Sequence, residues 1–134
     1  MPAIRIKDAA MLLGVSDDTV RRWVDGGNLT CSTDESGRKV IAGEVLAEFA
    51  QEHASPPPNP LGVATSARNR LVGLVTRVKA DHVMAEVQMQ CGPFTIVSLM
   101  STESVDQLGL EPGVIAVAVV KATTVIVETP GEAT

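Results

Sequence analysis

The first fifty residues carry apolar side chains at helical spacing in short stretches. Residues 7–13 place alanines and leucines on one side and end before a glycine, a residue that commonly terminates helices. Ser16 is a good N-cap for a second helix over residues 17–25, and a third helix is expected over residues 43–53. Between them, short apolar segments flank a polar, glycine-containing loop at residues 33–37, which predicts a β-hairpin. Two helices with a tight turn, followed by a hairpin, form the winged helix-turn-helix pattern.

From residue 70 onward the pattern changes to apolar runs and alternation, which predict β-strands. The expected strands cover residues 71–78, 83–90, 94–100, 114–120 and 124–127, with a capped helical turn over residues 101–110. Five short strands and one helical turn fit the layout of a small OB-like β-barrel. The sequence therefore predicts an α+β protein with two small domains, the first mainly helical and the second a five-stranded OB-like barrel.

A proline-rich stretch separates the two patterns. Its consecutive prolines favour a semi-rigid, extended spacer over residues 54–63. The predicted domains are therefore residues 1–53 and 64–129, with a loose tail over residues 130–134. Each domain lies near the size at which a hydrophobic core alone is marginal, and small domains often gain stability by oligomerising.

Composition narrows the class of protein. The net charge of -5 argues against a polybasic tail or a membrane-surface protein, and an aromatic content of 2% weakens any interpretation based on base stacking. Cys31 and Cys91 lack CxxC spacing, which is typical of reduced thiols in a cytosolic protein. The N-terminus has no signal-peptide apolar core and no apolar run is long enough to span a bilayer, so we expect a cytoplasmic protein without membrane contact.

Polar clusters flank the apolar runs of the second domain at residues 65–69, 101–104 and 121–124. They combine hydroxyls with an arginine in the first cluster and a lysine in the last. Proteins bind tetrahedral oxyanions with such hydroxyls, backbone N–H groups and a few cations. Each cluster alone also has an ordinary explanation, as a turn, a helix cap or a lysine snorkelling at a strand end. We interpret the clusters together as one oxyanion site that is completed between subunits.

The sequence gives little support for metal-cation binding or catalysis. His53 and His82 are single histidines without a carboxylate cluster, so no metal-cation site is expected. No set of nucleophile, general base and orienting residue is visible, so we expect neither an enzyme nor a cofactor.

The first domain resembles the winged helix-turn-helix of MerR-type regulators and phage excisionases over about residues 4–52. The resemblance is carried by IKDAA at 6–10, LGVS at 13–16, TVRRW at 19–23 and GRK at 37–39. In that family the second helix enters the major groove and the wing touches the DNA backbone. The resemblance implies these DNA contacts: Ser16, Thr19, Arg21, Arg22, Arg38 and Lys39. Trp23 is expected in the core rather than at the DNA.

An alternative explanation of the arginines stays open. Arg21 and Arg22 also fit a solvated helix face, as charged pairs usually do. Six basic residues stand against nine acidic ones up to Glu52, and this acidic balance disfavours binding to phosphates. A monomer with few phosphate contacts would bind DNA weakly, so two or more copies would have to act together.

The second domain resembles the Mop domain of molbindins, a molybdate-binding TOBE domain, over about residues 64–128. The resemblance is carried by SARN at 66–69, Gly73, AEV at 85–87, STESV at 101–105, LGL at 108–110, Gly113 and KATTV at 121–125. It implies molybdate or tungstate as the ligand, held by these residues: Ser66, Ala67, Arg68, Ser101, Thr102, Lys121, Ala122 and Thr123. In the implied arrangement, Ser66 and Arg68 of one subunit meet Ser101, Lys121 and Ala122 of another. Arg70 stands where many relatives carry glutamine, and we expect it to affect an interface rather than the pocket.

The two resemblances together imply a function. Family members with a single Mop domain form hexamers, built as trimers of dimers with oxyanions at the interfaces. This implies a homo-oligomer, either a dimer or such a hexamer. We expect an anion-responsive, DNA-binding transcriptional regulator. A molybdate storage protein without specific DNA binding is the alternative, and an accessory protein that delivers molybdenum to an enzyme also stays open.

Overall fold

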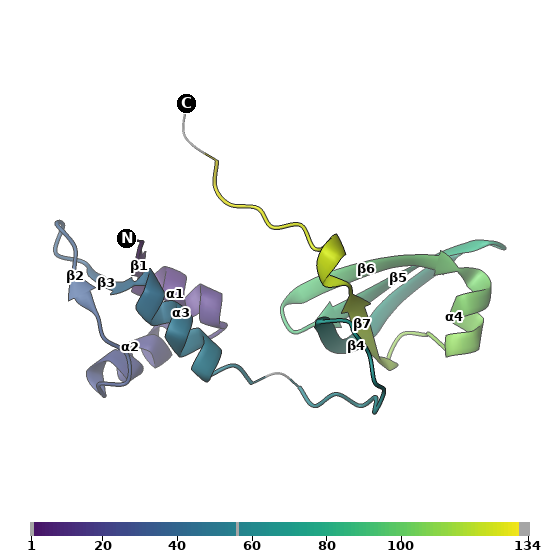
Figure 1. Ribbon diagram of the computed structural model, residues 1–134, viewed down its shortest axis with the longest axis horizontal. Helices are drawn as coiled ribbons and strands as arrows, with labels where there is room; N and C mark the ends of the chain where they lie inside the picture. Colours follow the sequence, from purple (N-terminus) through teal and green to yellow (C-terminus); the bar gives the residue numbers. More distant parts are fainter. Residues whose placement is uncertain (1, 56, 132–134) are drawn as a thin grey trace. The chain divides into compact units, whose positions relative to one another are not determined.

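The computed structural model describes residues 2–55 and 57–131, and the chain divides into the units Met1–Pro56 and Pro57–Thr134. Figure 1 shows the helical first unit and the sheet-rich second unit. Pro56 of the expected linker and residues 132–134 of the expected tail lie outside the described residues. No helix within the described ranges has the length and apolar character needed to cross a membrane.

The first unit is a helix-turn-helix followed by a hairpin and a third helix. Its elements are β1 (Ala3–Arg5), α1 (Ile6–Leu13), α2 (Asp17–Asp25), β2 (Ser32–Thr33), β3 (Lys39–Ala42) and α3 (Gly43–Glu52). The strands form a small antiparallel sheet in the order β1-β3-β2. Gly14 ends α1 in the left-handed conformation, at φ 70°, which glycine adopts without steric cost.

A single hydrophobic core holds the first unit together. Its buried members are Ile6, Ala9, Ala10, Val20, Leu29, Ile41, Leu46 and Phe49. Trp23 is half-buried against this core, with its ring centroid 5.0 Å from that of Phe49. The expectation that Trp23 packs rather than contacts DNA therefore agrees with its position at the edge of the core.

The second unit is a curled antiparallel sheet with one short helix. Its elements are β4 (Asn69–Ala80), β5 (Met84–Cys91), β6 (Phe94–Ser101), α4 (Thr102–Leu108), β7 (Ile115–Val120) and the 3-10 helix η1 (Ala122–Thr124). The strand order is β6-β5-β4-β7. The mixed α+β fold class is thus confirmed, with a helix-turn-helix unit and a curled, OB-like sheet.

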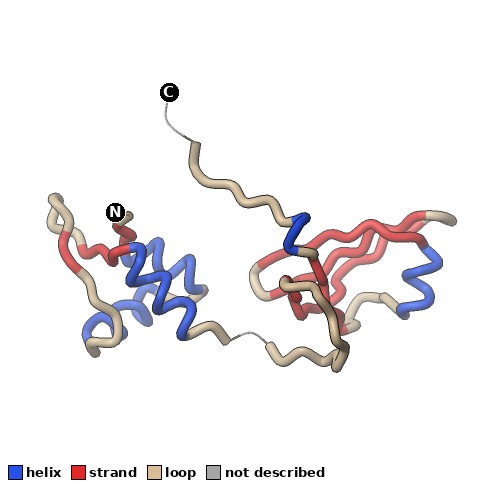
Figure 2. The backbone as a smooth tube through the Cα atoms, viewed as in Figure 1, coloured by secondary structure: helices blue, strands red, loops and turns tan. Residues whose placement is uncertain are grey.

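The predicted strand over residues 124–127 is wrong for this chain. The backbone turns through η1 after β7, and residues 125–131 form no regular structure (Figure 2). Ile126 and Val127 are 85% and 82% exposed. Their β-branched side chains favour a strand, but a strand also needs a neighbouring edge for its hydrogen bonds, and this segment pairs with none.

The long strand β4 organises the second unit. Its first half pairs with β7, from Asn69 opposite Val120 to Leu74 opposite Ile115. Its second half pairs with β5, up to Ala80 opposite Ala85, after a bulge between Val75 and Arg77. The end of β7 and the start of β5 therefore lie at opposite ends of β4, which is about 36 Å long at roughly 3.3 Å per residue.

The core of the second unit lies on the concave side of the sheet. Its buried members are Val75, Ala85, Val87, Met89, Cys91 and Val105. An apolar cavity of about 430 Å³ adjoins this core and is lined by residues of β5, β6 and β7 and by Leu61 of the linker segment. One chain thus presents a concave sheet with a substantial apolar hollow.

Candidate functional site

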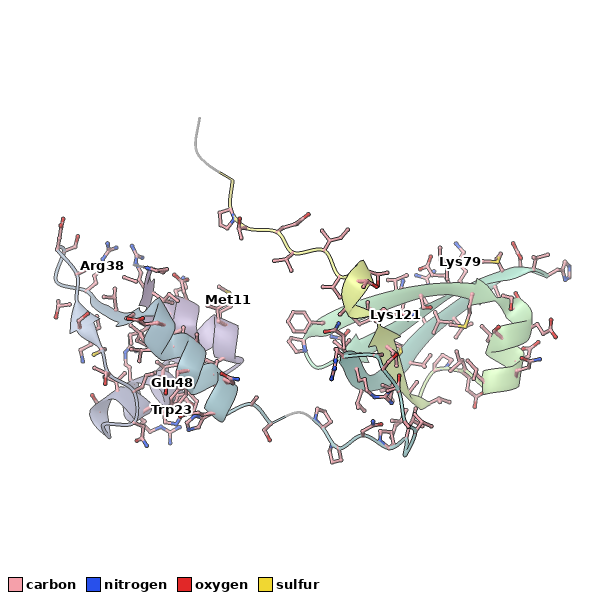
Figure 3. The ribbon with its side chains drawn as sticks, viewed as in Figure 1. Met11, Trp23, Arg38, Glu48, Lys79 and Lys121 are labelled. Carbon is pink, nitrogen blue, oxygen red and sulfur yellow. The ribbon has the colours of Figure 1, made fainter. Side chains whose placement is uncertain are left out.

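One corner of the sheet, where β4 begins and β7 ends, gathers two of the polar clusters. Asn69 lies opposite Val120, and the Asn69 side-chain amide donates to the Val120 carbonyl oxygen at 3.2 Å. This pairing brings residues 65–68, which precede β4, beside Lys121 and η1, which follow β7. We call residues 65–68 and 121–123 the β4–β7 corner. Figure 3 shows Lys121 next to η1, at the end of the sheet away from α4.

Local hydrogen bonds shape both segments of the β4–β7 corner. The Ala67 N–H donates to the Thr65 hydroxyl oxygen at 3.1 Å, which closes a tight turn. The Thr124 hydroxyl donates to the Lys121 carbonyl oxygen at 2.8 Å and fixes η1. Ala122 and Thr123 open this 3-10 helix, where the first N–H groups have no partner inside the helix. The corner therefore offers N–H donors from η1, whereas the N–H of Ala67 is already engaged.

The charge at the β4–β7 corner is positive in an acidic protein. Ser66, Arg68 and Lys121 are exposed. The ion pairs found among the described residues both lie in the first unit, so no described carboxylate pairs with Arg68 or Lys121. An exposed hydroxyl, the first N–H groups of η1 and two cations form a suitable environment for an anion.

Ser101 and Thr102 lie at the other end of the sheet. Ser101 is opposite Met84, next to the hairpin at which β4 ends, so in one chain it is far from Lys121. The resemblance implied that one subunit supplies Ser101, Lys121 and Ala122 to the same pocket. The register of the strands does not allow this within one chain. A pocket that contains Ser101 and Lys121 takes them from different copies, because β4 separates them along most of its length.

Both residues at this distant end have structural roles. Ser101 is the N-cap of α4, and its hydroxyl oxygen accepts from the Ser104 N–H at 3.1 Å. The Thr102 hydroxyl donates to the Asp81 carbonyl oxygen at 2.8 Å. The N–H groups of Met84 and Val83 donate to the Asp81 carboxylate and lower its pKa. The helix-cap explanation thus holds for Ser101, whose hydroxyl oxygen also lies 2.8 Å from the Ser104 hydroxyl oxygen, in a contact where either group can donate.

Arg70 was expected to affect an interface rather than the pocket. In the structure it lies next to the β4–β7 corner. It lies opposite Val119, one position from the Asn69–Val120 pair, and its Nε and Nη2 atoms are buried with no hydrogen-bond partner among residues 2–55 and 57–131.

In the first unit, α2 presents the side chains predicted to contact DNA. Ser16 caps the helix by accepting from the Thr19 N–H at 3.2 Å, and the two hydroxyls lie 2.9 Å apart. An Arg22 guanidinium nitrogen donates to the Thr19 hydroxyl oxygen at 3.3 Å. These contacts connect the cap to Arg22. Arg21 is exposed and lies 3.8 Å from Asp18, a weak surface pair.

The hairpin after α2 carries the remaining predicted contacts. Asp34 accepts from the N–H groups of Ser36 and Arg38 and pairs with the Arg38 guanidinium at 3.1 Å. The N–H of Arg38, with the other donors, lowers the pKa of Asp34. Lys39 is exposed at the start of β3. Arg38 is thus partly neutralised, whereas Lys39 forms no ion pair with a described residue.

No group of three or more metal-ligating side chains occurs within residues 2–55 and 57–131.

Two known domain families match the chain, one in each unit. A helix-turn-helix domain matches residues 4–54, and a TOBE domain matches residues 65–127. The class defined by fold and sequence is thus a helix-turn-helix domain joined to a TOBE domain.

Individual relatives match part of the chain. Molybdenum-pterin-binding protein 2 of Clostridium pasteurianum is 41% identical over 66 residues, which cover 48% of this chain and 97% of that protein. The transcriptional repressor DcmR of Methylorubrum extorquens is 34% identical over 87 residues, which cover 60% of this chain and 32% of the repressor. This chain thus spans about a third of the length of that repressor. The solved structure of a molybdate-binding protein from Sporomusa ovata covers 50% of this chain and 100% of its own, at 33% identity and a TM-score of 0.48.

The chain belongs, through its TOBE domain, to the family of the small molybdenum-pterin-binding proteins.

Proposed function

We propose that the protein binds molybdate or tungstate between copies of its TOBE domain and acts as an anion-responsive, DNA-binding transcriptional regulator in the cytoplasm. The observation that carries the proposal is the β4–β7 corner. It brings Ser66, Arg68 and Lys121 together in one chain that is otherwise acidic.

The donors at this corner suit a tetrahedral dianion. The Ser66 hydroxyl and the N–H groups of Ala122 and Thr123 supply hydrogen bonds, and Arg68 and Lys121 supply positive charge. An unpaired dianion is too costly to bury, so the pocket must replace its hydration with fixed donors. Ala67 contributes its N–H only if the bond to Thr65 opens.

A second copy completes the pocket. Ser101 and Thr102 lie at the far end of β4, so a neighbouring chain supplies them. An anion held between chains stabilises the assembly that contains the complete site, because it binds this state and not the separated chains. We expect a homo-oligomer, either a dimer or a hexamer built as a trimer of dimers.

The first unit then serves as the DNA reader, in the manner of MerR-type regulators and excisionases. Residues Ser16, Thr19, Arg21 and Arg22 of α2 would face the major groove, and Arg38 and Lys39 of the hairpin would contact phosphates. Few cations face DNA from each copy, so affinity depends on several copies acting together. An anion that changes the assembly therefore changes the spacing of the DNA-binding units.

A gel-shift experiment with and without molybdate tests the regulatory role. We expect a DNA complex whose affinity changes when molybdate is added. Replacing Arg21 and Arg22 by alanine should abolish the DNA complex and leave anion uptake intact, because the two units have separate cores. If DNA binding and anion uptake are lost together, the proposal that each unit carries one of these functions is wrong.

The alternative is a molybdate storage protein whose first unit binds no specific DNA. The acidic character of the first unit, with its weak Arg21–Asp18 pair and its Arg38–Asp34 pair, favours this alternative. The absence of any shifted complex, with anion uptake retained, would establish storage over regulation.

A further inference from the structure

The chain that connects α3 to β4, residues 53–68, is fixed to the first unit at His53. The His53 ring stacks on Phe49, with the ring centroids 3.9 Å apart and the ring planes 15° from parallel. The Nδ1 atom of His53 lies 3.0 Å from the Phe49 carbonyl oxygen, and its backbone N–H donates to the same oxygen at 3.0 Å. Stacking and hydrogen bonding therefore hold this chain to α3 as far as residue 53.

The same connecting chain meets the second unit at Leu61. Among its described residues, Leu61 is the one that lines the apolar cavity of about 430 Å³, opposite side chains of β5, β6 and β7. Leu61 is 47% exposed, so about half of its surface is removed from water. Val63 lies two residues further on, is 60% exposed and is outside the lining of the cavity. The contact therefore depends on one side chain.

A turn formed by the chain itself presents Leu61 to the cavity. The Leu61 N–H donates to the Asn59 side-chain oxygen at 2.9 Å, which closes a turn around Pro60. Proline restricts its own backbone and that of the residue before it, so Leu61 has little conformational freedom to lose on burial. Partial burial of a leucine then favours the fastened state by about fivefold. This balance holds the chain in place and still allows it to open.

We propose that Leu61 acts as a strap, which fastens the connecting chain to the apolar cavity and so sets the length of the free tether between the two units. With Leu61 fastened, the free tether is residues 54–60, which span at most about 25 Å. With Leu61 released, the free tether runs to residue 68, just before β4, and spans at most about 50 Å. One apolar side chain thus halves the reach of the helix-turn-helix unit.

This difference in reach matters for a protein that reads DNA with several copies. Half-sites on one face of the duplex are separated by about 34 Å, one turn of the double helix. The fastened tether is shorter than that distance and the released tether is longer. The strap would therefore limit which spacings of half-sites two DNA-binding units can reach together.

Backbone amide relaxation of the full chain tests whether Leu61 is fastened. The heteronuclear NOE of residues 61–64 is measured in the wild type, Leu61→Asp and Val63→Asp. We expect high values in the wild type and Val63→Asp, and values typical of a flexible chain in Leu61→Asp, because a carboxylate does not enter an apolar cavity. Val63→Asp is the matched control, since it adds the same charge two residues away. Equal mobility of residues 61–64 in the wild type and Leu61→Asp would overturn the strap.

Small-angle X-ray scattering on the same proteins measures the reach. Leu61→Asp should have a larger radius of gyration and a larger maximum dimension than the wild type and Val63→Asp, compared at the same assembly state. Leu61→Ala removes most of the apolar side chain without adding charge and should change both dimensions in the same direction. If neither Leu61 variant is larger than the wild type, Leu61 does not set the tether.

Neither measurement uses molybdate or DNA, so the strap and the proposed function can fail separately. A mobile connecting chain in a wild type that binds molybdate and shifts DNA would remove only the strap. A fastened chain in a wild type that binds neither anion nor DNA would remove the proposed function and leave the strap.

Discussion

At the scale of single residues, the glycine of the second unit with the tightest packing around its Cα is Gly73. A Cβ atom at this position would lie 2.5 Å from the Cys91 Sγ atom and 2.6 Å from the Gln90 carbonyl oxygen. Such contacts are well inside van der Waals distance, and one of them is to backbone. Glycine here allows β4 and β5 to approach each other above a buried thiol, whose pKa burial raises.

Replacing Gly73 by alanine should therefore destabilise the second unit by about 1–3 kcal/mol, the usual cost of overpacking a core. Thermal unfolding measures the change. Gly62→Ala is a matched control, since a Cβ atom there meets nothing within 4 Å, and it should leave stability unchanged. Removing the thiol with Cys91→Ala should not rescue Gly73→Ala, because the Gln90 carbonyl still blocks the new methyl group. A full rescue would contradict this explanation.

The stability of the hairpin is expected to depend on pH through Asp34. The N–H of Arg38, with the Ser36 N–H and the Arg38 charge, holds the pKa of Asp34 below the usual range of an aspartate. A lowered pKa means that the carboxylate stabilises the folded hairpin above the ordinary aspartate pKa. This contribution is lost as the pH falls below about 4 and passes through the folded pKa.

An NMR titration of the Ser36 and Arg38 amides checks this expectation. Both signals should shift together, with a midpoint below that of an unstructured aspartate. Asp34→Asn should keep the turn, because its amide oxygen still accepts the N–H groups, and should abolish the titration. A midpoint at or above the ordinary aspartate value would show that these hydrogen bonds do not form in solution.

At the scale of secondary-structure elements, α2 depends on its first residue. The Ser16 hydroxyl caps the helix and contacts Thr19, which in turn accepts from Arg22. One side chain thus contributes to helix stability and to the orientation of a side chain predicted to contact DNA.

Two substitutions at Ser16 separate these roles. Ser16→Ala should lower the stability of the first unit by about 1 kcal/mol, the typical cost of losing an N-cap. Ser16→Asp should keep that stability, because aspartate is an equally good cap, and should weaken DNA binding by adding negative charge beside the phosphates. Thermal unfolding and gel-shift titration provide the measurements. Unchanged DNA affinity in Ser16→Asp would place the N-terminus of α2 away from the DNA.

The sequence predicts elements that depend on local signals and misses those that depend on distant partners. The second helix was expected over residues 17–25 and is observed as Asp17–Asp25, since its cap and apolar stripe are both local. The strand expected over residues 124–127 is absent, because β-branched residues give propensity but no edge to pair with. The candidate hydroxyls were visible as a set, yet the sequence does not reveal that β4 separates Ser101 from Lys121. That separation follows from the pairing of β4 with β7, a contact between segments far apart in the chain.

At the scale of the whole molecule, a single chain is incomplete in several independent respects. The concave sheet leaves an apolar cavity of about 430 Å³, and Ile126 and Val127 are exposed after β7. The candidate oxyanion donors lie at opposite ends of β4. Association of copies would resolve each of these features by burying apolar surface and joining complementary ends.

Isothermal titration of the purified full chain with molybdate, tungstate and sulfate tests the central claim most directly. We expect molybdate or tungstate to bind with a dissociation constant of about a micromolar or tighter, equivalent to roughly 8 kcal/mol. Ser66→Ala should weaken this binding by about tenfold through the loss of one hydrogen bond to a charged group. An assembled protein that takes up neither molybdate nor tungstate at micromolar concentrations would contradict the account.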